Sequence, residues 1–128
     1  MKKIFIILLF SVFIVQTAFA KHEYPEKVYQ KHWCSQKGGI TEYKLDDGTR
    51  VDCLTDKLAV EFDFAPKWHE CIGQALYYGR KTNKTPACVL ILENDDDVRF
   101  LYRLKYAVFR RKNISDFQIY TIEKKDLP

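Results

Sequence analysis

The chain has 128 residues, of which 47% are hydrophobic and 15% aromatic. This length corresponds to one small domain, and the apolar content is sufficient for a core, so we expect neither several domains nor a disordered chain. The formal net charge of +4 permits nucleic-acid binding but does not by itself argue for it. The sequence contains no internal repeat, low-complexity segment or linker.

Residues 1–20 have the pattern of a secretory signal peptide. Two lysines precede an apolar run that is short for a membrane span, and the segment ends in the small-x-small pattern Ala18-Phe19-Ala20. We therefore expect residues 21–128 to form a single exported domain, either periplasmic or secreted. Removal of the segment takes away two lysines and lowers the net charge by two.

Residues 23–36 are predicted to form an amphipathic helix that ends before Gly38 and Gly39. A first strand is expected over residues 40–45. The expected apolar side of the helix carries Val28, Tyr29, His32 and Trp33.

The connection after the first strand decides which face of the sheet carries Glu42. Asp46-Asp47-Gly48 has the composition of a hairpin turn, in which Gly48 can take the left-handed conformation. A three-residue loop would place Glu42 opposite Asp52, whereas a two-residue loop would put Glu42 on the other face. The sequence leaves both registers open.

Residues 50–54 and 58–64 both have the pattern of strands, and the second alternates apolar and acidic residues. A two-residue turn between them places Asp52 directly opposite Glu61. Opposed carboxylates destabilise a sheet unless a cation lies between them. Mg²⁺ commonly takes one or two carboxylates plus a substrate phosphate, so we expect Asp52 and Glu61 to hold Mg²⁺ or Mn²⁺. An ordinary solvated acidic face is the alternative interpretation.

The same register has a second consequence further along the two strands. It places Arg50 opposite Asp63, and a cross-strand ion pair would account for both residues. Asp63 is therefore only a possible additional residue of the metal site.

The segment after the second of these strands predicts a helix, with a core stripe recurring over residues 68–79. Lys67, Gln74 and Tyr78 form a second row, in which Lys67 is nearest to Glu61. This row is expected to place a cation and an amide beside the acidic face.

The remaining elements complete an α/β pattern. Residues 87–92 are continuously apolar, as expected of a central strand buried on both faces. A helix is expected from Asn94 to Lys112, with its basic residues forming either a solvated face or a phosphate-contacting surface, and a last strand is expected over residues 117–122. The order α-β-β-β-α-β-α-β predicts an α/β fold with a mixed β-sheet flanked by helices.

Four cysteines, Cys34, Cys53, Cys71 and Cys88, lie in a domain expected to be exported, where disulfides form. Four cysteines allow three pairings, and the sequence does not choose among them. We favour Cys34–Cys53, because Cys53 should face away from Asp52 towards a packed helix. Cys71–Cys88 then follows.

The stretch over residues 42–78 resembles the core of the PD-(D/E)XK nuclease superfamily, which includes restriction endonucleases, Holliday-junction resolvases and bacterial recombination exonucleases. It is more closely similar to a group of small bacterial proteins with a strand reading RVDCLT, an E-x-D-F-A-x-K-W segment and an I-G-Q-x-L-Y-Y helix. These motifs match residues 50–55, 61–68 and 72–78. The resemblance implies a restriction endonuclease-like sheet, a magnesium-dependent nuclease activity and a nucleic-acid substrate, with DNA favoured.

The resemblance also implies roles for the acidic residues. Asp52 matches the first acid of the family and Glu61 the second. Glu42 is the candidate for an acid that family members often carry just upstream. Gln74 and Tyr78 match a Gln-x-x-x-Tyr pattern on the following helix in some subfamilies.

The chain departs from the family at the lysine. The third strand of the family reads Glu-x-Lys, whereas this chain reads Glu61-Phe62-Asp63. The resemblance implies that Lys67 supplies the lysine, because a shift of this residue onto the next helix is a known variation. In the nuclease hypothesis Asp52, Glu61, Lys67 and Gln74 are catalytic. The alternative hypothesis is a catalytically silent binding or interaction protein on the same scaffold.

Overall fold

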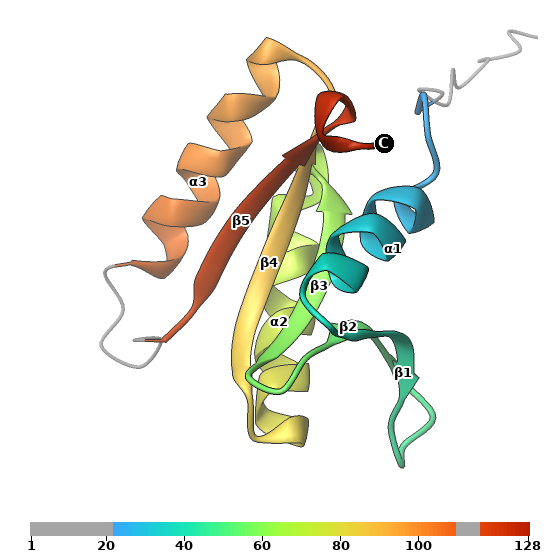
Figure 1. Cartoon of the computed structure of the whole chain (residues 1–128). Coiled ribbons are helices and arrows are strands. Elements are labelled where there is room, and N and C mark those ends of the chain that lie inside the picture. Colours follow the sequence, from blue (N-terminus) through green and yellow to red (C-terminus); the bar gives the residue numbers. More distant parts are fainter. Residues whose placement is uncertain (1–21, 110–115) are drawn as a thin grey trace, which may run out of the picture.

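The computed structural model describes residues 22–109 and 116–128 (Figure 1). The predicted signal peptide and the basic residues 110–112 lie outside the described residues. The helices are α1 (Glu26–Gln36), α2 (Trp68–Thr82) and α3 (Val98–Val108), with short 3-10 turns η1 (Ala65–Lys67), η2 (Asp95–Asp97) and η3 (Lys124–Asp126). The strands are β1 (Ile40–Lys44), β2 (Arg50–Leu54), β3 (Leu58–Phe64), β4 (Thr85–Leu92) and β5 (Gln118–Glu123).

The five strands form one sheet in the order β1-β2-β3-β4-β5. β1, β2 and β3 pair antiparallel, whereas β3, β4 and β5 pair parallel. Each parallel pair is joined by a crossover helix, as parallel pairing requires. The predicted α/β class with a mixed sheet flanked by helices is therefore confirmed.

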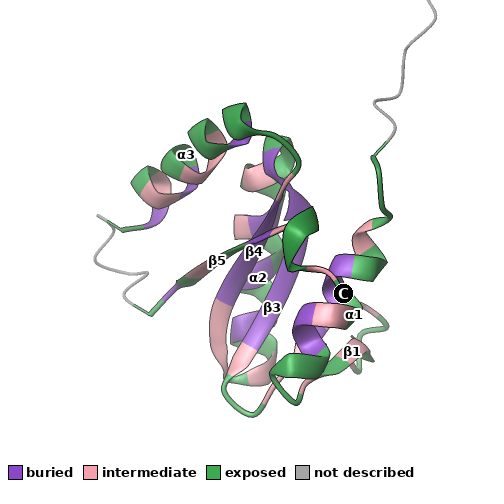
Figure 2. Cartoon of the chain, turned by 45° about the horizontal axis from the view of Figure 1, so that its top comes forward, coloured by how far each residue is buried: buried purple, intermediate pink, exposed green. Residues whose placement is uncertain are grey.

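The sheet is covered on both faces, with α1 on one side and α2 with α3 on the other (Figure 1). The continuously apolar strand β4 serves both layers, because Val89 and Ile91 pack towards α1 while Cys88 and Leu90 pack towards α2 and α3. Figure 2 shows this burial as a band along β3 and β4. The prediction of a central strand buried on both faces is confirmed.

The buried side of α1 differs from the predicted one. Val28 is 39% exposed, whereas the buried residues of the helix are Tyr29, Gln30, Trp33 and Cys34. Tyr29 and Trp33 pack edge-on against aromatic rings of β3, which turns the helix so that Gln30 and Cys34 also face inwards. The prediction of apolar contacts was right for the two aromatic residues and wrong for Val28.

The favoured disulfide pairing is confirmed, since Cys34 is bonded to Cys53 and Cys71 to Cys88. The first bond ties α1 to β2, and the second ties α2 to β4. Gly39 lies against the first bond, where a Cβ atom would come within 2.7 Å of the Cys34 sulfur. A side chain at this position would therefore displace the disulfide.

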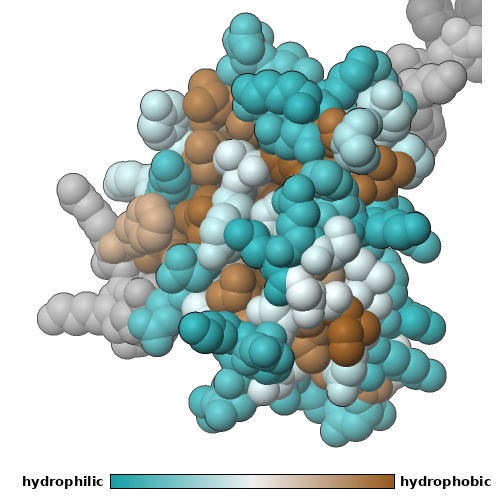
Figure 3. Space-filling view, viewed as in Figure 1, coloured by the Kyte–Doolittle hydropathy of each residue, from teal (hydrophilic) through white to brown (hydrophobic). Residues whose placement is uncertain are grey.

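The face viewed in Figure 3 carries separate hydrophobic and hydrophilic patches. Some aromatic side chains of α3 are exposed, including Tyr102 at 65% and Tyr106 at 82%. Within residues 22–109 and 116–128, no helix combines the length and the apolar character that a membrane span needs.

Candidate functional site

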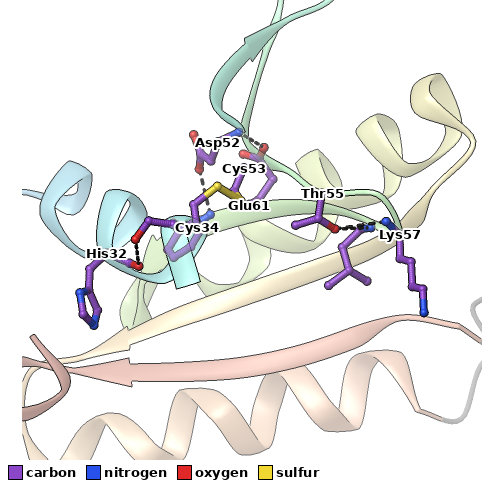
Figure 4. The surroundings of a disulfide bond; sticks show 10 residues. His32, Cys34, Asp52, Cys53, Thr55, Lys57 and Glu61 are labelled. Carbon is purple, nitrogen blue, oxygen red and sulfur yellow. Dashed lines mark hydrogen bonds between the residues drawn. A yellow bond between two sulfur atoms is a disulfide. The ribbon is translucent and has the colours of Figure 1, made fainter. Parts of the chain in front are cut away.

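The candidate site begins where β2 and β3 separate. The two strands pair through Cys53 with Val60 and Leu54 with Ala59, so the same register sets Asp52 opposite Glu61. At Asp52 and Glu61, hydrogen bonds to side chains replace the backbone hydrogen bonds between the two strands. The Asp52 backbone N–H donates to Glu61 Oε1 at 3.2 Å, and the Phe62 N–H donates to Asp52 Oδ2 at 2.8 Å. Figure 4 shows both carboxyl groups beside the Cys34–Cys53 disulfide.

The position of these two carboxyl groups raises both of their pKa values. Burial is the main cause for each, and the neighbouring Asp52 charge raises the pKa of Glu61 further. The hydrogen bond from the Phe62 N–H acts in the opposite direction on the pKa of Asp52. Glu61 is only 3% exposed. The pair therefore holds protons at pH values where free carboxyl groups are ionised.

Asp63 lies two residues further along the same face of β3. Burial, reinforced by the charges of Glu70 and Asp52, raises the pKa of Asp63 to about 7, and the Lys67 charge acts against this rise. Lys67 is in η1, and its Nζ lies 3.9 Å from a Glu70 carboxylate oxygen. Among the described residues Lys67 forms an ion pair with Glu70 and none with Asp52, Glu61 or Asp63, and its ammonium group stays largely exposed.

Glu42 joins the site through the register of the first hairpin. The Leu45 N–H donates to the Thr49 carbonyl at 2.8 Å, which closes a three-residue loop. Of the two registers that the sequence left open, this one sets Glu42 opposite Asp52, and the Glu42 charge contributes to the raised pKa of Asp52. Glu42 has a φ of 54°, an uncommon conformation for a residue with a side chain. The backbone of β1 therefore departs from regular extended geometry at Glu42.

Helix α1 adds two residues that the sequence analysis did not place in the site. Burial, followed by the charges of Asp52 and Asp63, raises the pKa of Glu26 to about 7. Gln30, one turn later, acts on Asp52 and lowers its pKa. The signal in the sequence was the four-residue spacing of Glu26, Gln30 and Cys34, which places all three on one side of the helix.

Helix α2 contributes one of its two predicted site residues. Tyr78 is buried, and desolvation together with the Glu61 and Asp52 charges raises the pKa of its hydroxyl. Gln74 lies on an exposed part of the helix, and among the described residues no hydrogen bond joins its side chain to the acidic group. The structure thus brings Tyr78, but not Gln74, to the Asp52–Glu61 pair.

The predicted ion pair between Arg50 and Asp63 is absent from the described part of the chain. β2 diverges from β3 beyond Asp52, and the Arg50 guanidinium donates instead to the Glu42 carbonyl at 3.4 Å. The prediction was wrong because it extended a regular ladder through a point where the carboxyl groups interrupt it.

The carboxylate oxygens of Asp52 and Glu61 are donors that suit a hard cation, but they are few. Asp52 and Glu61 each accept a backbone N–H, a side-chain hydrogen bond also acts between the two carboxyl groups, and Mg²⁺ or Mn²⁺ prefers oxygen donors of this kind. Within residues 22–109 and 116–128, however, no group of three or more His, Cys, Asp or Glu side chains is arranged to hold a metal ion. The residues fit a cation that takes two carboxylates here and further oxygens from water or a substrate.

The site lies between β2 and β3 where their backbone pairing ends, and we call this place the acidic gap. A surface pocket of 490 Å³ lies elsewhere, at the ends of β4 and β5, and is lined by Glu93, Asn94, Glu123 and Lys124 among others.

No protein-family model matches the chain, and neither curated proteins nor solved structures give a significant match.

Proposed function

We propose that this protein is an exported, metal-dependent nuclease that hydrolyses phosphodiester bonds, with DNA as the favoured substrate. The observation that supports the proposal most directly is the Asp52–Glu61 pair, in which two carboxyl groups lie opposite each other on neighbouring strands and both have raised pKa values. Such a pair is costly unless it serves a ligand, and strongly perturbed carboxyl groups concentrate at functional sites. The two disulfides are compatible with export.

In this proposal Asp52 and Glu61 hold Mg²⁺ or Mn²⁺ through their remaining oxygens. The ion would supply charge for the scissile phosphate and lower the pKa of a bound water. Glu42, Glu26 and Asp63 surround the pair and would bind water molecules of the ion's hydration shell. Loss of protons from the pair must accompany binding, because only the ionised carboxylates are good ligands.

Lys67 would stabilise negative charge that develops on the phosphate. Its charge already acts on Asp63 and on Glu26, so its ammonium group can approach the same gap. Its exposure leaves it free to move towards a substrate. Gln74 would reach the reaction only through substrate or water, because it lies on the exposed face of α2.

The experiment is a Mn²⁺ titration of the oxidised protein, followed by incubation with single- and double-stranded DNA in Mg²⁺. Asp52→Asn and Glu61→Gln keep the shape of each side chain and remove its charge. We expect each substitution to weaken Mn²⁺ binding at least tenfold and to abolish cleavage. Asp56→Asn, in the exposed β2–β3 turn, is the matched control and should change neither property.

Cleavage that survives Asp52→Asn unchanged would contradict the proposal.

The second candidate function is a binding protein of the periplasm or extracellular space without catalysis. It is favoured by the presence of Asp63 where the resembled family has its lysine. A wild-type protein that neither binds Mn²⁺ at millimolar concentration nor cleaves DNA would support that second candidate.

A further inference from the structure

Helix α3 exposes a row of aromatic side chains on the side that is turned away from the sheet (Figure 2). Leu104 and Val108 supply its buried side. Tyr102, Tyr106 and Phe109 are 65%, 82% and 61% exposed, and their spacing of four and three residues places them together on one side of the helix. Large aromatic side chains that lie together in solvent mark an interaction site.

Two arginines lie beside this aromatic row. Arg99 and Arg103 are exposed one turn apart, and their guanidinium groups lie 4.8 and 5.3 Å from the centre of the same Phe100 ring. The shared ring holds two positive charges on one side of the helix, although like charges four residues apart destabilise it. None of the ion pairs in the described part of the chain includes either arginine. Both charges are therefore open to a negatively charged ligand.

The two rows match each other in spacing and lie next to the proposed site. Four residues rise about 6 Å along a helix, so the two tyrosines and the two arginines repeat in parallel at the same interval. A strand of nucleic acid presents the complementary pattern, because it alternates flat bases with charged phosphates. Helix α3 also packs against η1, the turn that carries Lys67.

We propose that the outer face of α3 binds a single strand of nucleic acid. Bases stack on Tyr102 and Tyr106, and phosphates contact the guanidinium groups of Arg99 and Arg103. This inference rests on the proposed function for the class of ligand and adds a binding surface outside the acidic gap. Aromatic rings combined with cations bind single strands without reading their sequence. The bases of a duplex are stacked on one another, so the aromatic row specifies an unpaired strand.

A membrane surface fits the same face less well. Helices that lie in a membrane interface bury aliphatic side chains in the lipid and carry their cations on the opposite face. In α3 the aliphatic residues Leu101 and Leu104 pack into the protein core instead. The arginines lie beside the exposed rings and not opposite to them.

Substitutions that remove or keep the flat rings test the stacking. Tyr102→Leu/Tyr106→Leu keeps apolar bulk and removes both rings, whereas the matched control Tyr102→Phe/Tyr106→Phe keeps them. Each oxidised protein is titrated with a fluorescent single-stranded DNA oligonucleotide in EDTA, which prevents metal binding and cleavage. We expect the Leu variant to bind about tenfold more weakly or worse, and the Phe variant to stay within about twofold of the wild type. Equal melting temperatures would show that the fold is intact, as expected at exposed positions.

The dependence of binding on salt tests the two arginines. Arg99→Gln/Arg103→Gln should reduce the slope of log affinity against log salt concentration by about 1.4, because each phosphate contact of a single strand contributes about 0.7. Arg80→Gln, at an exposed position of α2, is the control and should leave the slope unchanged. An unchanged slope in the double variant would overturn the assignment of phosphates to these arginines.

Equal affinities of the Leu variant and the wild type would overturn the inference, as would equal losses in the Leu and Phe variants. A duplex that binds as tightly as the single strand would also overturn it. Wild-type protein that binds vesicles of anionic phospholipid but not the oligonucleotide would assign the face to a membrane instead.

The proposed function fails in a different way. A wild type that binds the oligonucleotide through α3 in EDTA, but neither binds Mn²⁺ nor cleaves DNA, defeats the nuclease proposal and supports this inference. Cleavage in Mg²⁺ by a protein whose oligonucleotide affinity is the same in all these variants defeats this inference alone.

Discussion

Asp52 and Glu61 each hold a backbone N–H of the opposite strand, so the two carboxyl groups are part of the strand pairing as well as of the site. This double role limits what a substitution can report. Replacement by alanine would leave two buried N–H groups without acceptors, which costs stability in its own right. Asn and Gln keep an acceptor oxygen in place and remove only the charge, and they are therefore the informative replacements.

Lys67 supplies the positive charge in the proposed nuclease site, and its role can be tested directly. We expect Lys67→Met to lower the rate of DNA cleavage about 100-fold, because one charged donor at the reacting phosphate typically contributes that much. Mn²⁺ affinity should not fall, since the lysine repels the ion. Single-turnover cleavage in Mg²⁺ is the measurement.

Lys57→Met, in the β2–β3 turn at the far end of these strands, is the control for the Lys67 prediction. It should cleave at the wild-type rate. A Lys67→Met protein that also cleaves at the wild-type rate would remove the lysine from the chemistry.

At the scale of elements, α1 is positioned on the site by one covalent bond and two aromatic contacts. The Cys34–Cys53 disulfide joins the helix to β2 next to Asp52, and Tyr29 and Trp33 pack on Phe64 and Phe62 of β3. This arrangement keeps the acidic end of the helix over the gap. The second disulfide ties together α2 and β4, which leaves α1 and β2 unaffected.

The two disulfides therefore give a matched comparison. They span similar sequence separations of 19 and 17 residues, and each should contribute about 3 kcal/mol in the chain-entropy model. We expect the double variants Cys34→Ala/Cys53→Ala and Cys71→Ala/Cys88→Ala to lose similar unfolding free energy in urea. Only the first should also weaken Mn²⁺ binding, because only the first releases α1 from β2. Equal Mn²⁺ affinities in the two variants would show that the first disulfide does not position the site.

At the scale of the whole molecule, the acidic gap should make stability depend on pH. The folded-state pKa values of Asp63 and Glu26 rise to about 7 from ordinary values of 3.8 and 4.5, and those of Asp52 and Glu61 rise as well. The folded protein therefore binds more protons than the unfolded chain from about pH 4 upwards, to about pH 7 for Asp63 and Glu26 and to about pH 9 for Glu61. Its unfolding free energy falls as pH rises through that window, by about 1.4 kcal/mol per pH unit for each such carboxyl group.

Glu61→Gln tests this pH dependence, because it replaces a carboxyl group that must ionise with a neutral amide of the same shape. We expect the variant and the wild type to be equally stable at pH 4, and the variant to be more stable at pH 8. Mg²⁺ at pH 8 should raise the melting temperature of the wild type and leave that of the variant unchanged. Thermal unfolding followed by circular dichroism measures both effects, with Asp56→Asn as the control. A wild-type stability that does not change between pH 4 and pH 8 would contradict the burial of these charges.

The sequence by itself determined the α/β class, the mixed sheet and the placement of Asp52 opposite Glu61. It could do so because strand periodicity and short turns are local properties. The Asp56-Lys57 turn sets Asp52 opposite Glu61. The same local reasoning narrowed the position of Glu42 to two registers.

Only the tertiary structure decided which other residues meet this pair. Glu26 and Gln30 are more than twenty residues from Asp52 in the chain, and they reach it because aromatic packing and a disulfide fix the orientation of α1. The backbone pairing of β2 with β3 likewise ends at Asp52 and Glu61, each of which accepts a backbone N–H from the other strand, and no local pattern encodes this. The raised pKa values follow from that burial and not from the order of the residues, because desolvation is a property of the packed molecule.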